Sequence, residues 1–278
     1  MRMQTLFSLA AFGLLPWTAL GHGDVHGQIV DVTAQIAKDP TNASLLIRRG
    51  ELYRVNQHWD HAQSDFDRAL TLAPGLAVVD FLRGRLYLEA DWPHSACAAL
   101  DRFLAIHTNH VEALVTRARA RQKIEDRLAA AMDYTRAIQF AVEPRPELFI
   151  ERAQVLMAAG TNHFAEALRG LDEGIARLGP LVTLQLYAID LEIKLGRFDE
   201  ALRRLDHVAA QSPRKETWLA RRGEILTQAG RPEEARAAFQ AALSALDKLP
   251  QSRRNVPAMM ELEKRIKAEL QTLNGKQQ

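Results

Sequence analysis

Cysteine is almost absent from the sequence, since Cys97 is the only one. One thiol cannot form an intramolecular disulfide, so the fold must be stabilised by packing. A strong charge of one sign is also missing, because 36 Lys and Arg against 34 Asp and Glu leave a formal charge of +2. A nearly neutral chain has no general electrostatic attraction for nucleic acid or for an anionic membrane. We therefore expect no nucleic-acid partner.

Long apolar runs are missing as well. The apolar run at 6–15 follows Arg2 and is too short to cross a bilayer, which takes about 20 apolar residues. Small residues end the segment at Gly21, and this arrangement is typical of a secretory signal peptide. We predict a signal peptide at 1–21 and an exported mature chain, periplasmic or secreted, that has no integral membrane segment. An uncleaved anchor is the alternative.

The motifs of common catalytic sites are not found in the sequence. There is no nucleophile elbow, no Gly-rich phosphate loop, no zinc-protease helix motif and no cluster of paired cysteines. Each of these motifs exists because its chemistry needs close geometry. The sequence therefore predicts a protein that is not an enzyme and that has no cofactor.

What the sequence does contain is a degenerate repeat. RRGELY at 48–53 is similar to RRGEIL at 221–226. Aligning the chain on this segment gives units that start at 43, 77, 111, 146, 182 and 216, with a period of 34 to 36 residues. Position 8 of these units is mostly small: Gly50, Gly84, Ala118, Ala153, Ile189 and Gly223. A repeat of this period indicates an array of small structural units.

Two helices are predicted in each unit. Apolar and small residues recur at helical spacing in both halves of a unit, as in Leu46, Gly50 and Tyr53 and then in Ala62 and Phe66. We expect the small residues at positions 8 and 20 to let the two helix backbones approach, with the large residue at position 24 beside them. Turn glycines separate the helices, and prolines close most units: Gly160, Gly196 and Gly230; Pro74, Pro144, Pro180, Pro213 and Pro250.

These columns resemble the tetratricopeptide repeat (TPR) family over residues 43–250. The resemblance implies an all-α, right-handed superhelical solenoid of about six TPR-like helix pairs. Solenoids need capping helices, and we predict an N-terminal one within 22–42 and a C-terminal one, with a tail, within 251–278. The C-terminal cap would carry the apolar stripe of Met259, Leu262, Ile266, Leu270 and Leu273.

Function in this family lies on a concave groove lined by the first helix of each unit. The resemblance therefore implies a scaffold or adaptor that binds an unidentified protein or peptide. The predicted groove residues are Ile47, Glu51, Arg54, Phe81, Arg85, Val115, Arg119, Lys123, Ile150, Gln154, Leu186, Asp190 and Glu224. Their apolar stripe and basic middle suit a peptide with an acidic segment. Ile47 and Glu51 replace the Lys and Asn with which chaperone-tail binders of the family clamp a terminal carboxylate, so that ligand is disfavoured.

Arginine recurs at position 7 of five units: Arg49, Arg83, Arg117, Arg152 and Arg222. A ladder that binds a polyanion is one interpretation. We favour the structural one, in which these side chains lie between the paired helices and bond to acidic residues of the second helix such as Asp65 and Asp133.

Histidines give an alternative function. His22 would be the mature N-terminus, His26 follows it, and His58 and His61 lie at the turn of the first repeat. An amino terminus with imidazoles can hold Cu(II) or Zn(II). A periplasmic metal-binding or metal-handling protein is therefore the second hypothesis, although no spacing fixes a coordination geometry.

Overall fold

The computed structural model describes residues 25–275, so the predicted signal peptide and His22 lie outside the described residues. Every regular element within this range is a helix. The helices are α1 (Val25–Lys38), α2 (Ala43–Val55), α3 (Trp59–Leu72), α4 (Ala77–Glu89), α5 (Pro93–Ile106), α6 (Val111–Lys123), α7 (Arg127–Phe140), α8 (Pro146–Ala159), the 3₁₀ turn η1 (Thr161–His163), α9 (Phe164–Leu178), α10 (Val182–Lys194), α11 (Phe198–Ala210), α12 (Lys215–Gln228), α13 (Pro232–Asp247), α14 (Gln251–Arg254) and α15 (Pro257–Gly275). The predicted all-α class is confirmed.

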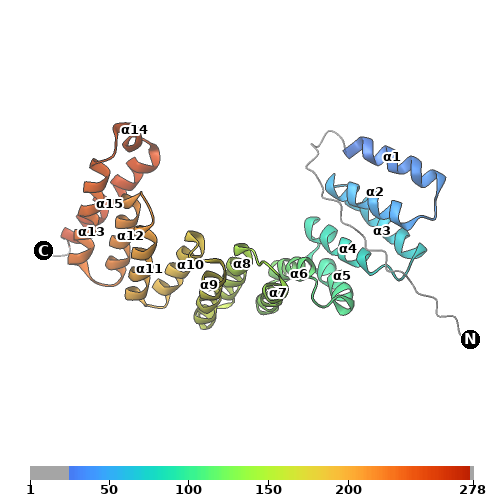
Figure 1. Ribbon diagram of the computed structural model, residues 1–278, viewed down its shortest axis with the longest axis horizontal. Coiled ribbons are helices and arrows are strands. Elements are labelled where there is room, and N and C mark those ends of the chain that lie inside the picture. Colours follow the sequence, from blue (N-terminus) through green and yellow to red (C-terminus); the bar gives the residue numbers. More distant parts are fainter. Residues whose placement is uncertain (1–24, 276–278) are drawn as a thin grey trace, which may run out of the picture. The chain divides into compact units, whose positions relative to one another are not determined.

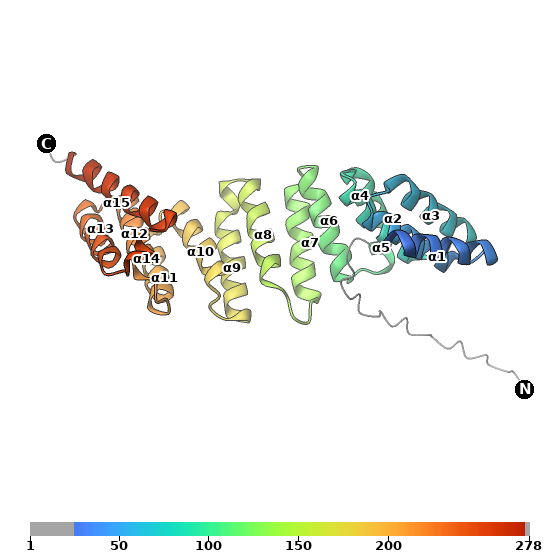
Figure 2. The same cartoon turned by 90° about the horizontal axis from the view of Figure 1, so that it is seen from above.

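The chain divides into two compact units, the first ending at Leu86 and the second starting at Tyr87. In the first unit α1 packs on α2, and α2 packs on α3. In the second unit each helix from α5 to α13 packs on the next one, and α15 closes the series against α12 and α13 (Figures 1 and 2). The predicted array of helix pairs with a leading and a closing helix is therefore observed.

Local chemistry explains where the helices begin and where the pairs turn. Asn42 caps α2 by accepting a hydrogen bond from the backbone N–H of Ser44 at 3.1 Å. Proline opens α5, α8 and α13, where its missing N–H has no helical partner to lose. The turn between the helices of every pair uses a positive φ, at Gly160, Gly196 and Gly230 as predicted, and also at Gln57, Asp91 and Glu125.

The large residue at position 24 fills the space beside position 8, as we predicted. A Cβ atom added to Gly50 would lie 2.6 Å from Cε1 of Phe66, and one added to Gly223 would lie 2.6 Å from Cε1 of Phe239. Each ring occupies position 24 of the repeat to which its glycine belongs, and both rings are fully buried. The glycine therefore makes room for an aromatic ring.

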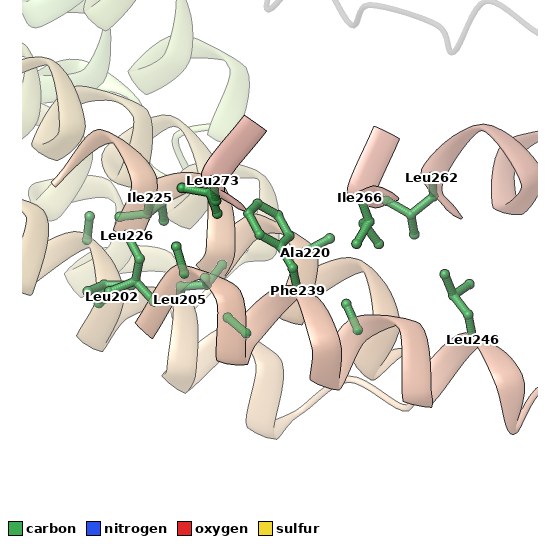
Figure 3. Close-up of a cluster of buried hydrophobic side chains, with 14 of the residues drawn as sticks. Leu202, Leu205, Ala220, Ile225, Leu226, Phe239, Leu246, Leu262, Ile266 and Leu273 are labelled. Carbon is green, nitrogen blue, oxygen red and sulfur yellow. The ribbon is translucent and has the colours of Figure 1, made fainter. Parts of the chain in front are cut away.

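The closing helix is part of the core of the second unit. Figure 3 shows Leu262, Ile266 and Leu273 of α15 in one cluster with Phe239 and Leu246 of α13. Arg236 of α13 also donates from Nη2 to the carbonyl oxygen of Leu273 at 3.2 Å. Within residues 25–275 no helix is both long enough and apolar enough to span a membrane.

Candidate functional site

The candidate site is the face formed by positions 9, 12 and 13 of the first helices. In the second unit these helices are α6, α8, α10 and α12, together with the last turn of α4. A shallow, open depression of about 500 Å³ lies on this face. Its lining residues are Leu88, Arg119, Gln122, Lys123 and Glu151. The structure thus brings two predicted groove residues, Arg119 and Lys123, to one hollow.

Arg119 and Glu151 form a two-point ion pair across the depression. Nε of Arg119 donates to Oε2 of Glu151 at 3.0 Å, and Nη2 donates to Oε1 at 2.7 Å. Burial alone would raise the pKa of Glu151, but the hydrogen bonds from Arg119 and Tyr134 outweigh it and hold that pKa below its usual range. The pair joins α6 to α8, so it links two neighbouring repeats.

Tyr134 of α7 contacts this ion pair from the core of the protein. Its ring is fully buried, and its hydroxyl donates to Oε2 of Glu151 at 2.6 Å. Burial and the neighbouring carboxylate raise the pKa of Tyr134, so the hydroxyl stays protonated and remains a donor. Glu151 is therefore held by two partners, one at the surface and one in the core.

Lys123 lies at the rim of the depression. Its Nζ is 2.5 Å from Oδ1 of Asp91, which belongs to the turn before α5. Both side chains are well exposed, Lys123 by 46% and Asp91 by 77%. An ion pair in such a setting is weak, so Lys123 can exchange this partner for another anion.

The residues at position 9 of α6, α8 and α10 make the same kind of contact. Each one contacts position 6 of the next first helix, as Arg119 contacts Glu151. Nε2 of Gln154 donates to the hydroxyl of Tyr187 at 2.9 Å, and Nη2 of Arg221 donates to Oδ1 of Asp190 at 2.5 Å. Glu224, in the last repeat, pairs instead with Arg265 of α15 at 3.3 Å. The predicted groove residues at position 9 thus also connect neighbouring helices.

The first unit places its predicted groove residues in a more buried cluster. Glu51, Arg54 and Phe81 are 9%, 7% and 7% exposed. Nε of Arg54 donates to Oε1 of Glu51 at 2.9 Å, and Nη1 of Arg85 lies 3.5 Å from Oε2 of the same carboxylate. Our expectation that Glu51 faces an open groove needs correction, because its carboxylate is held by two arginines. Ile47 and Arg85 are partly buried.

The apolar groove residues of the second unit are partly covered. Ile150 and Leu186 are half-buried, and Val115 is 5% exposed. Val115 therefore belongs to the core, while Ile150 and Leu186 can still contact a ligand. The exposed members of the face are polar, namely Arg119, Lys123, Gln154 and Asp190.

Sequence reasoning missed the partners on the neighbouring helix. Glu151, Tyr187 and Arg221 all occupy position 6, which is not among the predicted groove positions. The available signal was the separation of 32 residues between Arg119 and Glu151, close to one repeat.

The predicted contact of position 7 with an acid of the paired second helix is observed for Arg49, Arg117 and Arg152. Arg49 bonds to Asp65 through Nε and Nη2, both at 2.7 Å. Arg117 does the same with Asp133 at 2.8 and 2.6 Å. The acceptor Asp65 is 4% exposed and Asp133 is 2% exposed, so these pairs lie between packed helices and are not a surface ladder. Arg83 and Arg222 instead pair with Asp67 and Asp206 of the preceding second helix, whose side chains are 46% and 60% exposed.

The metal hypothesis gains no support from the described residues. His58 and His61 lie with ring centroids 5.9 Å apart, beside the ring of Tyr53. Within residues 25–275 no group of three or more His, Cys, Asp or Glu side chains is placed to hold a metal ion. His26 is exposed at the start of α1. Cys97 is partly buried, and burial raises the pKa of its thiol.

Comparison with known protein families gives a match to part of the chain. Residues 150–261 match a sequence model described as a tetratricopeptide repeat-like domain. No curated protein is significantly similar in sequence.

Solved structures share the fold at low sequence identity. The C-terminal part of a TPR repeat-containing protein from Cytophaga hutchinsonii superposes with a TM-score of 0.63 at 15% identity, covering 82% of this chain and 95% of that one. PilW, described as a type IV pilus biogenesis factor, gives 0.52 at 22% identity, covering 70% and 91%. A tetratricopeptide repeat protein from Parabacteroides merdae gives 0.51 at 20% identity, covering 88% and 93%. At these identities the likeness concerns the fold alone.

Proposed function

We propose that this tetratricopeptide repeat (TPR) protein is an exported, non-enzymatic scaffold that binds a protein or peptide on the first-helix face of its second unit. The observation that supports this most is the open depression beside α6, where Arg119, Gln122 and Lys123 meet the apolar side chain of Leu88. A surface with polar groups around an apolar contact is suited to an extended peptide, whose backbone and side chains need both. Half-buried Ile150 and Leu186 extend the apolar part of the same face.

Binding energy on such a face comes from burial of apolar surface, and the polar groups set register and partner choice. The contacts of Gln154 with Tyr187 and of Asp190 with Arg221 matter here, because they hold neighbouring helices of the face in one arrangement before a ligand arrives. A preorganised surface loses less entropy on binding. We therefore place the site on Arg119, Gln122, Lys123 and Gln154, whose side chains remain accessible.

An affinity capture from the exported fraction tests the site. The groove variant combines Lys123→Glu with Gln154→Arg, which change the charge at two exposed positions of α6 and α8. The matched control combines Arg169→Glu with Gln139→Arg, which make the same changes at exposed positions of the second helices α9 and α7. We expect the groove variant to lose the partner captured by the wild type, and the control to retain it, at equal melting temperatures. A partner retained by the groove variant, or lost equally by both, would contradict the proposed site.

Export rests on the N-terminal sequence and has its own test. The apolar run at 6–15, preceded by Arg2 and ended by small residues, is the basis of the proposal. We expect a chain with a C-terminal tag to be recovered from the periplasm or the medium, with His22 as its first residue by mass spectrometry. Recovery of the whole chain from the cytoplasm with an intact N-terminus would refute export.

A further inference from the structure

Glu151 occupies the place on Arg119 that a ligand carboxylate would take. Its two oxygens accept from Nε and Nη2 of Arg119, which is the side-by-side geometry by which a guanidinium binds a carboxylate. The Arg119 side chain is nevertheless 46% exposed, and Glu151 is 23% exposed. The guanidinium of Arg119 is therefore accessible to solvent while it is bonded to a residue of the same chain.

The depression is electrically balanced in this state. Arg119 and Lys123 supply two positive charges, and their partners Glu151 and Asp91 supply two negative ones. A neutral segment gains no charge interaction from such a surface. A segment with carboxylates gains one only by replacing an internal partner, and the exposed pair of Lys123 and Asp91 is the easier of the two to replace.

Glu151 can leave Arg119 without becoming a buried, unpaired charge. Tyr134 would still donate to its Oε2 atom, at 2.6 Å in the present arrangement. The carboxylate also has access to water, since it is partly exposed. Its release from Arg119 thus avoids the large penalty that an isolated buried carboxylate would incur.

We infer that the depression beside α6 binds a carboxylate-bearing peptide segment, and that Glu151 is the internal competitor which this carboxylate replaces on Arg119. The inference rests on the proposed function, because it needs the first-helix face to bind peptides. Glu151 then determines specificity without being part of the ligand contact. It excludes segments that lack an acid and sets how strongly an acidic one must bind. An apolar side chain next to the acid would lie against Leu88.

Two variants of α8 separate competition from general electrostatics. Glu151→Gln removes the competing charge, and the amide oxygen can still accept from the Tyr134 hydroxyl. Glu147→Gln removes the same charge from an exposed position one turn earlier on the same helix. The probes are a fluorescently labelled peptide of alternating leucine and glutamate, and the same peptide with glutamine at every glutamate. Anisotropy gives the affinity of each, and thermal melts confirm that the variants are folded.

We expect Glu151→Gln to bind the glutamate peptide about tenfold more tightly than the wild type does, because a competing like charge is gone. Glu147→Gln should change this affinity less than twofold, and the glutamine peptide should not distinguish the three proteins. Adding Arg119→Gln to Glu151→Gln should abolish the gain, which places it on Arg119.

Equal tightening by both α8 variants, no tightening by Glu151→Gln, or no binding of the glutamate peptide to Glu151→Gln would each overturn the inference. If both peptides bind all proteins with the same affinity, the result supports peptide binding and contradicts the competition by Glu151. A different result would contradict the proposed function itself, namely that the affinity capture retains the partner with the groove variant.

Discussion

At the scale of single residues, Gly50 is required by its neighbour and not by its backbone. It lies inside α2, where no positive φ is needed. A methyl group added there would lie 2.6 Å from the ring of Phe66, which is fully buried and cannot move into solvent. Overpacking of this kind in a core costs about 1–3 kcal/mol.

The prediction is that Gly50→Ala lowers the free energy of unfolding by about 1–3 kcal/mol, measured by urea denaturation. Phe66→Leu in the same chain should recover part of the loss, because the ring that causes the clash is gone. Gly75→Ala is the matched control, since a Cβ at this loop position meets nothing within 4 Å. If Gly50→Ala is as stable as Gly75→Ala, the ring moves aside at no cost and our interpretation of position 8 is wrong.

Contacts between residues could be predicted from the sequence where both partners belong to one repeat. Arg49 and Asp65 recur as Arg117 and Asp133, so two columns of the repeat pointed to the same pair. The contact of Arg119 with Glu151 could not be found in this way. It joins position 9 of one repeat to position 6 of the next repeat. The residue types at these two positions change along the chain, so no column of the repeat shows a constant residue type.

At the scale of elements, α6 has an uncommon N-terminal cap. His110 precedes the helix, and its Nδ1 atom accepts a hydrogen bond from the backbone N–H of Ala113 at 3.1 Å. Only a ring with an unprotonated Nδ1 can accept this bond. Burial, followed by the charge of His107, lowers the pKa of His110 below its ordinary value of 6.5, and Glu112 opposes the shift in part.

Stability should therefore fall as the solution becomes acidic. The unfolded chain binds a proton at His110 near pH 6.5, whereas the folded chain binds it only at lower pH. Between these two pKa values the unfolded state holds more protons, so the free energy of unfolding rises with pH there. The contribution is complete above pH 6.5 and is lost as the pH falls through the folded-state pKa.

The test compares the wild type with His110→Asn, which keeps a capping acceptor that does not titrate. We expect the difference in unfolding free energy between the two proteins to shift in favour of the variant as the pH falls below 6.5. The change should not exceed about 1 kcal/mol, which is the usual value of a side-chain cap. A difference that stays constant from pH 8 to pH 5 would show that His110 does not cap α6 in its neutral form.

The ends of the helices were the part of the fold that could be predicted most directly from the sequence. Prolines and turn glycines fix them chemically, as at Gly196 and Gly230, whose φ values are 71° and 70°. The equivalent turns at Gln57, Asp91 and Glu125 adopt the same conformation without a glycine, and only the period of the repeat locates them. The short helix α14 (Gln251–Arg254) follows the last repeat, where no period remained to predict it.

At the scale of the whole molecule, stability is expected to be local along the chain. Within residues 25–275, helices of the second unit pack mainly on their sequence neighbours, and α15 packs mainly on α13, with smaller contacts to α12 and α14. In a repeat array each repeat is stabilised by its neighbours, so the loss of one interface does not reach distant repeats. The closing helix covers the cluster around Phe239 and Leu246, which would otherwise be exposed (Figure 3).

Ile266→Ala tests this locality. Ile266 is 1% exposed within the cluster, and removing such a side chain costs about 2–5 kcal/mol. In hydrogen exchange we expect faster exchange in α12, α13 and α15, because their shared interface opens more often, and unchanged exchange in α2, α3 and α6. Met260→Ala is the control, since Met260 lies on the same helix but is 59% exposed, and it should leave every helix protected. Acceleration in all helices to the same extent would instead mean that the chain unfolds as one cooperative body, and that α15 stabilises the entire protein rather than its last repeat.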